Sequence, residues 1–195
     1  EHMGTRLWLG SSSTTTVDDL EFDPGLIWIK PRDYADNHNL FDSVRGGTYA
    51  LYSNLSDRET YTAGGPDELT FLPNGFSVRG DSNSLNRNDY QFVSWNLKAG
   101  GAAVTNTDGS ITSQVSANPD MGFSIISYTG NSSSGSTIGH GLGNVPSIVF
   151  HKRVDANVNW SVGTSAVGWG AYLTLNSTNA STPLGSMWNS TAPSS

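Results

Sequence analysis

The feature that most constrains the fold is an internal repeat, in which residues 24–54 match residues 146–176 without a gap. The two segments are 122 residues apart along the chain. The identical pairs are Pro24/Pro146, Lys30/Lys152, Asp33/Asp155, Asn37/Asn159, Ser43/Ser165, Gly46/Gly168, Leu51/Leu173 and Asn54/Asn176. Chance similarity between two β-rich stretches is the alternative, but the ungapped register with matched turn residues favours a repeat.

Inside and outside the repeat, short apolar or alternating segments are separated by Gly, Asn, Asp and Ser, which is the pattern of β-strands. The clearest segment is 90–98, where Gln91, Val93, Trp95 and Leu97 share one face of the expected strand. The other expected strands are 26–30, 49–53, 76–78, 111–115, 123–128, 146–150 and 171–175. This pattern predicts an all-β protein, an antiparallel β-sandwich or barrel.

Composition excludes several classes of function. The formal net charge is −7, which argues against nucleic-acid binding because neutralising phosphates requires a basic face. The chain has no cysteine, so it has no disulfide and no thiolate metal site. The longest apolar run is about four residues, far below the ~18 expected of a membrane-spanning helix, so we expect no membrane insertion.

The repeat suggests a division of the chain. Residues 1–4 resemble a cloning remnant, residues 5–126 form the first β-unit with its linker, and residues 127–195 form a partial second unit. The second unit has no counterpart of the strand expected at 90–98, so its sheet is expected to have an open edge that must be covered or paired. We expect the partial unit to pack beside the first.

The segment 25–46, GLIWIKPRDYADNHNLFDSVRG, resembles a tandem repeat of phage virion and tail-fibre-like proteins, especially those of marine phages. Asn74-Gly75-Phe76, the segment 95–101 and the linker 106–131 are similar to the same family. Such repeats often lie beside laminin-G-like or concanavalin-like modules. The resemblance therefore implies a lectin-like, jelly-roll-like sandwich in a virion, with a structural or receptor-binding role and no catalytic residue.

The loop 33–39 is rich in oxygen ligands. Asp33, Asp36 and Asn37 are close together in the sequence and could bind Ca²⁺. The alternative is turn architecture, which Asp and Asn also favour. Asp33 and Asn37 recur in the second copy whereas Asp36 does not, which fits turns better than a shared ion site. No other cofactor is expected.

Aromatic residues in expected loops are candidates for sugar contacts, because rings stack on the apolar faces of sugars. The candidate glycan contacts are Tyr34, Asp36, His38, Tyr61, Trp169 and Trp188. We expect Trp28, Trp95, Phe71, Phe76 and Phe123 to be core residues instead.

The alternation Asp19-Leu20-Glu21-Phe22-Asp23 is the strongest enzymatic candidate, since paired carboxylates on a strand suit a glycosidase. A solvated strand face, with Leu20 and Phe22 directed inward, is the preferred interpretation. Asp42 and Arg45 are within reach of an ion pair, which we expect to be structural.

These observations predict a non-enzymatic module of a phage tail fibre or appendage that recognises a host-surface glycan. A structural spacer or decoration domain of the virion is one alternative, and a glycan depolymerase is another. The expected partners are the glycan and other virion proteins. Fibres are often trimeric, so by analogy a homo-oligomer is a further expectation.

Overall fold

In the computed structural model the chain is all-β, as predicted, and its sheets are antiparallel. The structure describes residues 1–61, 68–183 and 185–195. Its strands are β1 (Met3–Leu9), β2 (Thr15–Val17), β3 (Leu26–Pro31), β4 (Asn39–Asp42), β5 (Gly46–Tyr52), β6 (Leu69–Leu72), β7 (Gly75–Val78), β8 (Gln91–Leu97), β9 (Val104–Asn106), β10 (Ser113–Asn118), β11 (Phe123–Tyr128), β12 (Ile148–His151), β13 (Ser161–Thr164), β14 (Ala171–Thr174) and β15 (Thr182–Pro183). One 3₁₀ turn, η1 (Gly185–Trp188), is the only helical element in these ranges.

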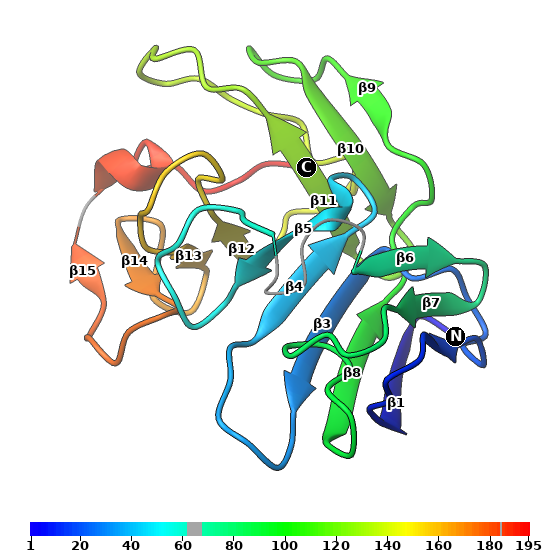
Figure 1. The fold of residues 1–195 in the computed structure, drawn as a ribbon. Helices are drawn as coiled ribbons and strands as arrows, with labels where there is room; N and C mark the ends of the chain where they lie inside the picture. The colour runs from blue at the N-terminus through cyan, green and yellow to red at the C-terminus, as the bar shows by residue number, and fades with distance from the viewer. Residues whose placement is uncertain (62–67, 184) are drawn as a thin grey trace.

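Two sheets face each other in the first half of the chain. The larger has the order β1-β8-β3-β4-β5, and the smaller has the order β2-β7-β6 (Figure 1). The apolar core lies between them and is built from fully buried side chains of both sheets. Its largest fully buried members are Ile27, Ile29, Phe41, Phe76 and Phe92. Burying apolar faces of two sheets against each other is what stabilises a β-sandwich.

The strand expected at 90–98 is β8, and its two faces alternate as the sequence predicts. The face toward the core carries Phe92, Ser94 and Asn96, all fully buried. The side-chain N–H groups of Asn96 are satisfied there, because they donate to the Gly4 carbonyl at 3.0 Å and to the Ser94 hydroxyl at 2.9 Å. The opposite face, with Trp95, is only half-buried. The face richer in large apolar residues is therefore the outer one.

The second half of the chain forms two further sheets, with the orders β11-β10-β9 and β12-β13-β14-β15. Figure 1 shows β12, β13 and β14 beyond β5, on the side of the large sheet away from β1. The two halves are joined by hydrogen bonds. The Trp160 indole N–H donates to the Tyr52 carbonyl at 2.8 Å, and the Glu59 amide donates to the Val154 carbonyl at 2.9 Å.

The hairpins β3-β4-β5 and β12-β13-β14 have the same strand register. Leu26 pairs with Asp42, and Ile148 pairs with Thr164. Ile148 and Thr164 each lie 122 residues further along the chain than Leu26 and Asp42. The β4–β5 and β13–β14 pairings also match at this offset, through Leu40↔Leu51 and Val162↔Leu173. The strand pairing in the two hairpin systems thus matches at the offset that relates the two segments in the sequence.

Two local expectations change. The acidic segment 19–23 is not a strand, although Leu20 and Phe22 are buried and the three acids are exposed, as predicted. Met3 and Gly4, in the segment that resembles a cloning remnant, are part of β1 and pair with Leu97 and Asn96.

Candidate functional site

Tyr34, a predicted sugar contact, is fixed at one end of the sandwich. Its ring packs edge-on against Tyr90 with a centroid separation of 4.7 Å, and the Arg87 guanidinium lies 5.4 Å from its centroid. Its hydroxyl donates to the Asn83 carbonyl. Burial, with a contribution from Asp36, raises the pKa of the Tyr34 hydroxyl to about 12. Tyr34 thus makes several contacts within the protein.

The predicted calcium ligands are each engaged with a different backbone or side-chain partner. Both carboxylate oxygens of Asp33 accept from the Gln91 amide, at 3.2 and 3.0 Å. Asp36 accepts from the Asn37 amide at 2.7 Å, and the Asn37 side-chain oxygen accepts from Asn54 at 2.9 Å. In the part of the chain that the structure describes, no three His, Cys, Asp or Glu side chains gather as metal ligands. Calcium binding at this loop stays a prediction.

His38 lies in a groove between the two halves of the molecule, with a volume of about 390 Å³. The groove, called the Trp28–His38 groove below, is lined by Trp28, His38, Ser53, Asn54, Leu175, Asn176, Ser177 and Thr178. The Trp28 and His38 rings are 6.1 Å apart between centroids and tilted by 54°. The loop after β5 and the loop after β14 thus meet over the outer face of β3.

Two asparagines fix the loops that form the groove. The Asn54 side-chain oxygen accepts from the His38 amide at 3.0 Å, and the Asn176 oxygen accepts from the Trp160 amide at 3.0 Å. Each donates its side-chain N–H to a second asparagine at 2.9 Å: Asn54 to Asn37, and Asn176 to Asn159. Asn54 and Asn176 are repeat equivalents. Equivalent loops of the two hairpin systems therefore present preorganised polar groups to one groove.

The groove is electrically neutral. Its lining residues include no Asp, Glu, Lys or Arg. Burial, assisted by the nearby positive charge of Lys30, lowers the pKa of the His38 imidazole below its ordinary value, so His38 is neutral at pH 7. The groove thus combines aromatic rings with amide and hydroxyl groups and carries no formal charge.

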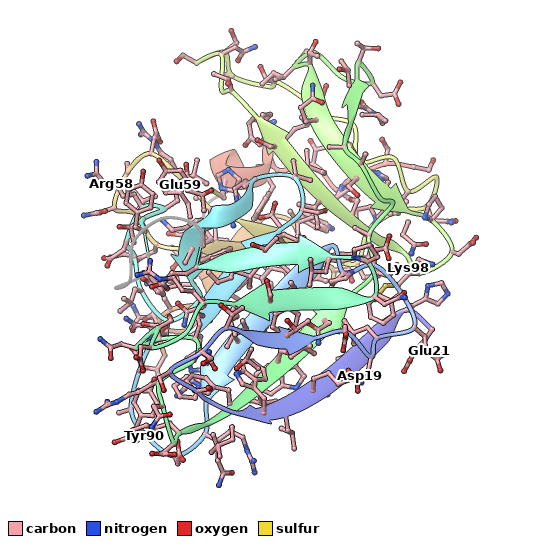
Figure 2. All side chains as sticks on the ribbon, turned by 45° about the vertical axis from the view of Figure 1, so that its right-hand side comes forward. Asp19, Glu21, Arg58, Glu59, Tyr90 and Lys98 are labelled. Carbon is pink, nitrogen blue, oxygen red and sulfur yellow. The ribbon has the colours of Figure 1, made fainter. Side chains whose placement is uncertain are left out.

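Tyr61 lies in a second hollow of about 360 Å³, called the Tyr49–Tyr61 hollow below. It is lined by Tyr49, Arg58, Glu59, Thr60, Tyr61, Val154 and Asp155. The Tyr49 and Tyr61 rings are stacked at 4.8 Å, and their hydroxyls are 3.2 Å apart. Figure 2 shows Arg58 and Glu59 near each other at this end of the molecule, so this hollow is charged.

Trp169 and Trp188, the other two predicted sugar contacts, pack against each other as a T-shaped pair with a centroid separation of 5.8 Å. Both rings pack against Gly163, where an added Cβ would lie 2.5 Å from Trp169 and 2.8 Å from Trp188. They are half-buried and fill the space beside β13. The structure therefore places the five predicted sugar contacts that carry rings in four separate environments.

Trp28 is expected in the core from its sequence, but it lies on the outer face of the large sheet and lines the groove. The alternation of side chains in β3 could have predicted this placement. Ile27 and Ile29 are fully buried, and Trp28, which lies between them in the strand, is directed to the opposite face of the sheet. Trp95 lies beside it on the same face, 5.9 Å away between centroids.

Asp19, Glu21 and Asp23 line neither the Trp28–His38 groove nor the Tyr49–Tyr61 hollow. Asp19 pairs with Arg6 at 2.6 Å, and Asp23 accepts from the Asn74 amide at 3.1 Å. Figure 2 shows Asp19 and Glu21 on the side of the molecule that carries Lys98, far from Arg58 and Glu59 in that view. Arg45 and Asp42 form the expected structural ion pair at 2.7 Å, nearly buried, and Arg45 also contacts Glu59 at 3.2 Å.

A family model matches residues 1–195, the whole of the sequence, and its description is a domain of unknown function, DUF7483. The chain belongs to the DUF7483 family. No curated protein and no solved structure matches this DUF7483 chain. Among its described residues, no helix has the length and apolar character needed to span a membrane.

Proposed function

We propose that this DUF7483 chain is a non-enzymatic glycan-binding module, and that the Trp28–His38 groove is its binding site. The observation that carries the proposal is the lining of the groove, which combines an indole and a neutral imidazole with amides and hydroxyls and includes no charged side chain.

This combination suits an uncharged sugar. The C–H face of a pyranose packs on aromatic rings, which supply apolar area with a polar periphery. Its hydroxyls exchange hydrogen bonds with groups that can both donate and accept, such as the side chains of Ser53, Ser177 and Thr178. Since Asn54 and Asn176 are already held by hydrogen bonds, binding requires little ordering of the groove.

The biological setting in the proposal is a phage tail fibre or appendage that contacts a host-surface glycan. It rests on the resemblance of residues 25–46 to virion repeats. Other virion proteins and a homo-oligomer, trimeric by analogy, belong to the same proposal.

A second candidate function is a structural spacer of the virion. It is favoured by strand β12, whose outward edge has no strand partner among the described residues and whose Ile148 and Phe150 are 50% and 53% exposed. A spacer would use such an edge for assembly and would bind no sugar in the groove.

Binding of the labelled protein to a panel of bacterial glycans, with and without Ca²⁺, tests the proposal. The variant Trp28→Ala is expected to lose binding. The matched control Trp95→Ala, which removes the ring packed edge-on against Trp28 on the same sheet face but outside the groove lining, is expected to retain it. Thr178→Arg, which places a long charged side chain in the groove, is expected to weaken binding without a change in fold.

Calcium-dependent binding would direct attention to the loop with Asp33, Asp36 and Asn37. Equal loss of binding in the two tryptophan variants would contradict the groove as the site. Failure of the folded protein to bind any glycan of the panel would contradict glycan recognition and favour the spacer.

A further inference from the structure

The two hairpin systems differ in what lies at their outer edge. In the large sheet, β3 is paired on one side with β4 and on the other with β8, and β8 is paired in turn with β1. In the second half, β12 is paired with β13 and β11 with β10. Within the described residues no strand pairs with the other edge of β12 or of β11.

Strand β11 is the counterpart of β1 in the sequence. Trp8 in β1 and Tyr128 in β11 are 120 residues apart and are both followed by Thr/Leu-Gly. The bounds of the two strands match at the same offset, since β1 begins at Met3 and β11 begins at Phe123. Of the five strands of the large sheet, β1, β3, β4 and β5 therefore have equivalents in the second half, and β8 has none among the described residues.

One side-chain contact joins the two strands with open edges. The Tyr128 hydroxyl of β11 and the His151 Nε2 of β12 are 2.9 Å apart, and their rings are 6.2 Å apart between centroids. These side chains join the strands although no main-chain pairing does. Strands flanking one intervening strand are separated by about twice 4.8 Å, a distance that Tyr and His side chains can bridge together.

Hydrogen bonds at the strand ends show which amides of β12 are free. The Ser165 amide donates to the Ser147 carbonyl, so by the alternation of an antiparallel pair the amides of Val149 and His151 are directed toward β13. The amides of Ile148 and Phe150 are then directed toward the open edge. In β3 the equivalent amides, of Leu26 and Trp28, are directed toward β8, as the bond from Arg32 to the Gln91 carbonyl indicates.

The side chains at the open edge are also uncovered. Trp28 in β3 has Trp95 of β8 directly across from it, at 5.9 Å. Phe150, the equivalent of Trp28, is 53% exposed, and Ile148 is 50% exposed. An edge strand with free amides and exposed apolar side chains is a template for strand addition.

We propose that the open β11/β12 edge is a docking site for one extended polypeptide strand of β8 chemistry, which lies antiparallel to both strands. The occupant is a partner strand other than those of residues 1–195. It carries aromatic or aliphatic side chains opposite Ile148 and Phe150 and small polar side chains in between, as Ser94 and Asn96 alternate with Trp95 and Leu97 in β8. This inference is independent of the glycan proposal.

The test uses the intact, ¹⁵N-labelled protein and a synthetic peptide with the sequence of residues 91–101, QFVSWNLKAGG. At saturating peptide we expect hydrogen exchange of the Ile148 and Phe150 amides to slow about tenfold or more, because new ladder bonds form. A peptide with proline in place of Trp95 is expected not to bind, since proline interrupts a central strand.

Two protein variants locate the site. Phe150→Pro removes an N–H that the fold does not use and is expected to weaken peptide binding about tenfold or more. Thr5→Pro removes an outward N–H from β1, the open edge of the large sheet, and is expected to leave binding unchanged. Circular dichroism checks the fold of both.

Three results would overturn the proposal. The first is the absence of peptide binding to the folded wild-type protein. The second is binding that leaves the Ile148 and Phe150 amides unprotected or that Thr5→Pro abolishes. The third is a dimer in sedimentation with Phe150 already protected in the absence of peptide, because a second copy of the chain would then be the occupant.

Discussion

The hairpins β3-β4-β5 and β12-β13-β14 share a register but not a core. Phe41 in β4 is fully buried between two sheets, whereas its equivalent in β13 is Gly163, over which Trp169 and Trp188 pack. The equivalent of the buried Ile29 is His151, which contacts Tyr128. The same strand pairing thus accommodates two different ways of filling the space beside it.

Two of the identical pairs, Lys30/Lys152 and Asn54/Asn176, have side chains that bind the backbone in both copies. Lys30 donates to the carbonyls of Pro31 and Tyr34 at 2.9 and 3.4 Å, and Lys152 donates to those of Arg153 and Ala156 at 3.0 and 3.4 Å. Asn54 and Asn176 follow the same rule. Loop hydrogen bonds therefore preserve the register, while the core residues adapt to the neighbouring sheet.

Substitutions at Phe41 and Gly163 should separate the two cores most strongly. Phe41→Ala opens a cavity in a fully buried site and is expected to cost about 3–5 kcal/mol of the free energy of unfolding. Gly163→Ala forces a Cβ against two indole rings and is expected to cost about 1–3 kcal/mol. Denaturant unfolding measures both, and a harmless Gly163→Ala would contradict the packing described for β13.

The loop asparagines test whether the shared hydrogen bonds are equally important. Asn54→Ala and Asn176→Ala each remove one accepted and one donated hydrogen bond, so each is expected to cost about 2 kcal/mol. Thermal unfolding of the two variants is the measurement. A large loss in one and none in the other would show that the second loop does not depend on the same contact.

Gly46 and Gly168 are a matched pair with smaller effects. Their φ angles are +86° and +78°, and an added Cβ would meet nothing within 4 Å at either site. Alanine should therefore cost only backbone strain, about 1–2 kcal/mol, and nearly the same amount at both positions. Unfolding free energies that differ by more than that strain would contradict equivalent turns.

The pH dependence of stability should distinguish His151 from Ile29, its apolar equivalent. Burial, together with Lys152, lowers the pKa of His151 in the folded protein. In the unfolded chain His151 binds a proton as the pH falls below about 6.5, whereas in the folded protein it does so only at a lower pH. Protonation of His151 therefore favours unfolding between about pH 6.5 and its lower pKa in the folded protein. The wild type should lose thermal stability over this range.

The variant His151→Ile should lose less stability over the same range. The residual pH dependence would include His38, whose pKa is also lowered. Identical pH profiles of the wild type and the variant would contradict a lowered pKa of the half-buried His151.

Much of the fold follows from sequence alternation, and its exceptions have physical causes. The strand at 90–98 could be predicted from alternation, but not which of its faces is buried, because Ser94 and Asn96 are buried through hydrogen bonds that depend on Gly4 far away in the sequence. The segment 19–23 alternates without being a strand, since Leu20 and Phe22 are anchored in the core without a ladder.

The candidate site was less predictable. His38 could be selected as a loop aromatic, but the groove requires Trp28 from a strand and Ser177 and Thr178 from the other half of the chain. No local pattern reveals that these loops meet. The repeat indicated Asn54 and Asn176 as equivalent residues, but only the structure shows that both line one groove.

Hydrogen exchange of two equivalent amides, Trp28 and Phe150, tests the comparison most directly. Trp28 lies in a strand paired on both sides, whereas the outer edge of β12 has no partner among the described residues. The account predicts slow exchange of the Trp28 amide and fast exchange of the Phe150 amide in the free protein. The Val149 amide is expected to exchange at an intermediate rate, because it donates to β13 but lies in a strand that is paired on one side only within the described residues. Equally slow exchange at Trp28 and Phe150 would contradict it, because the edge of β12 would then already be paired.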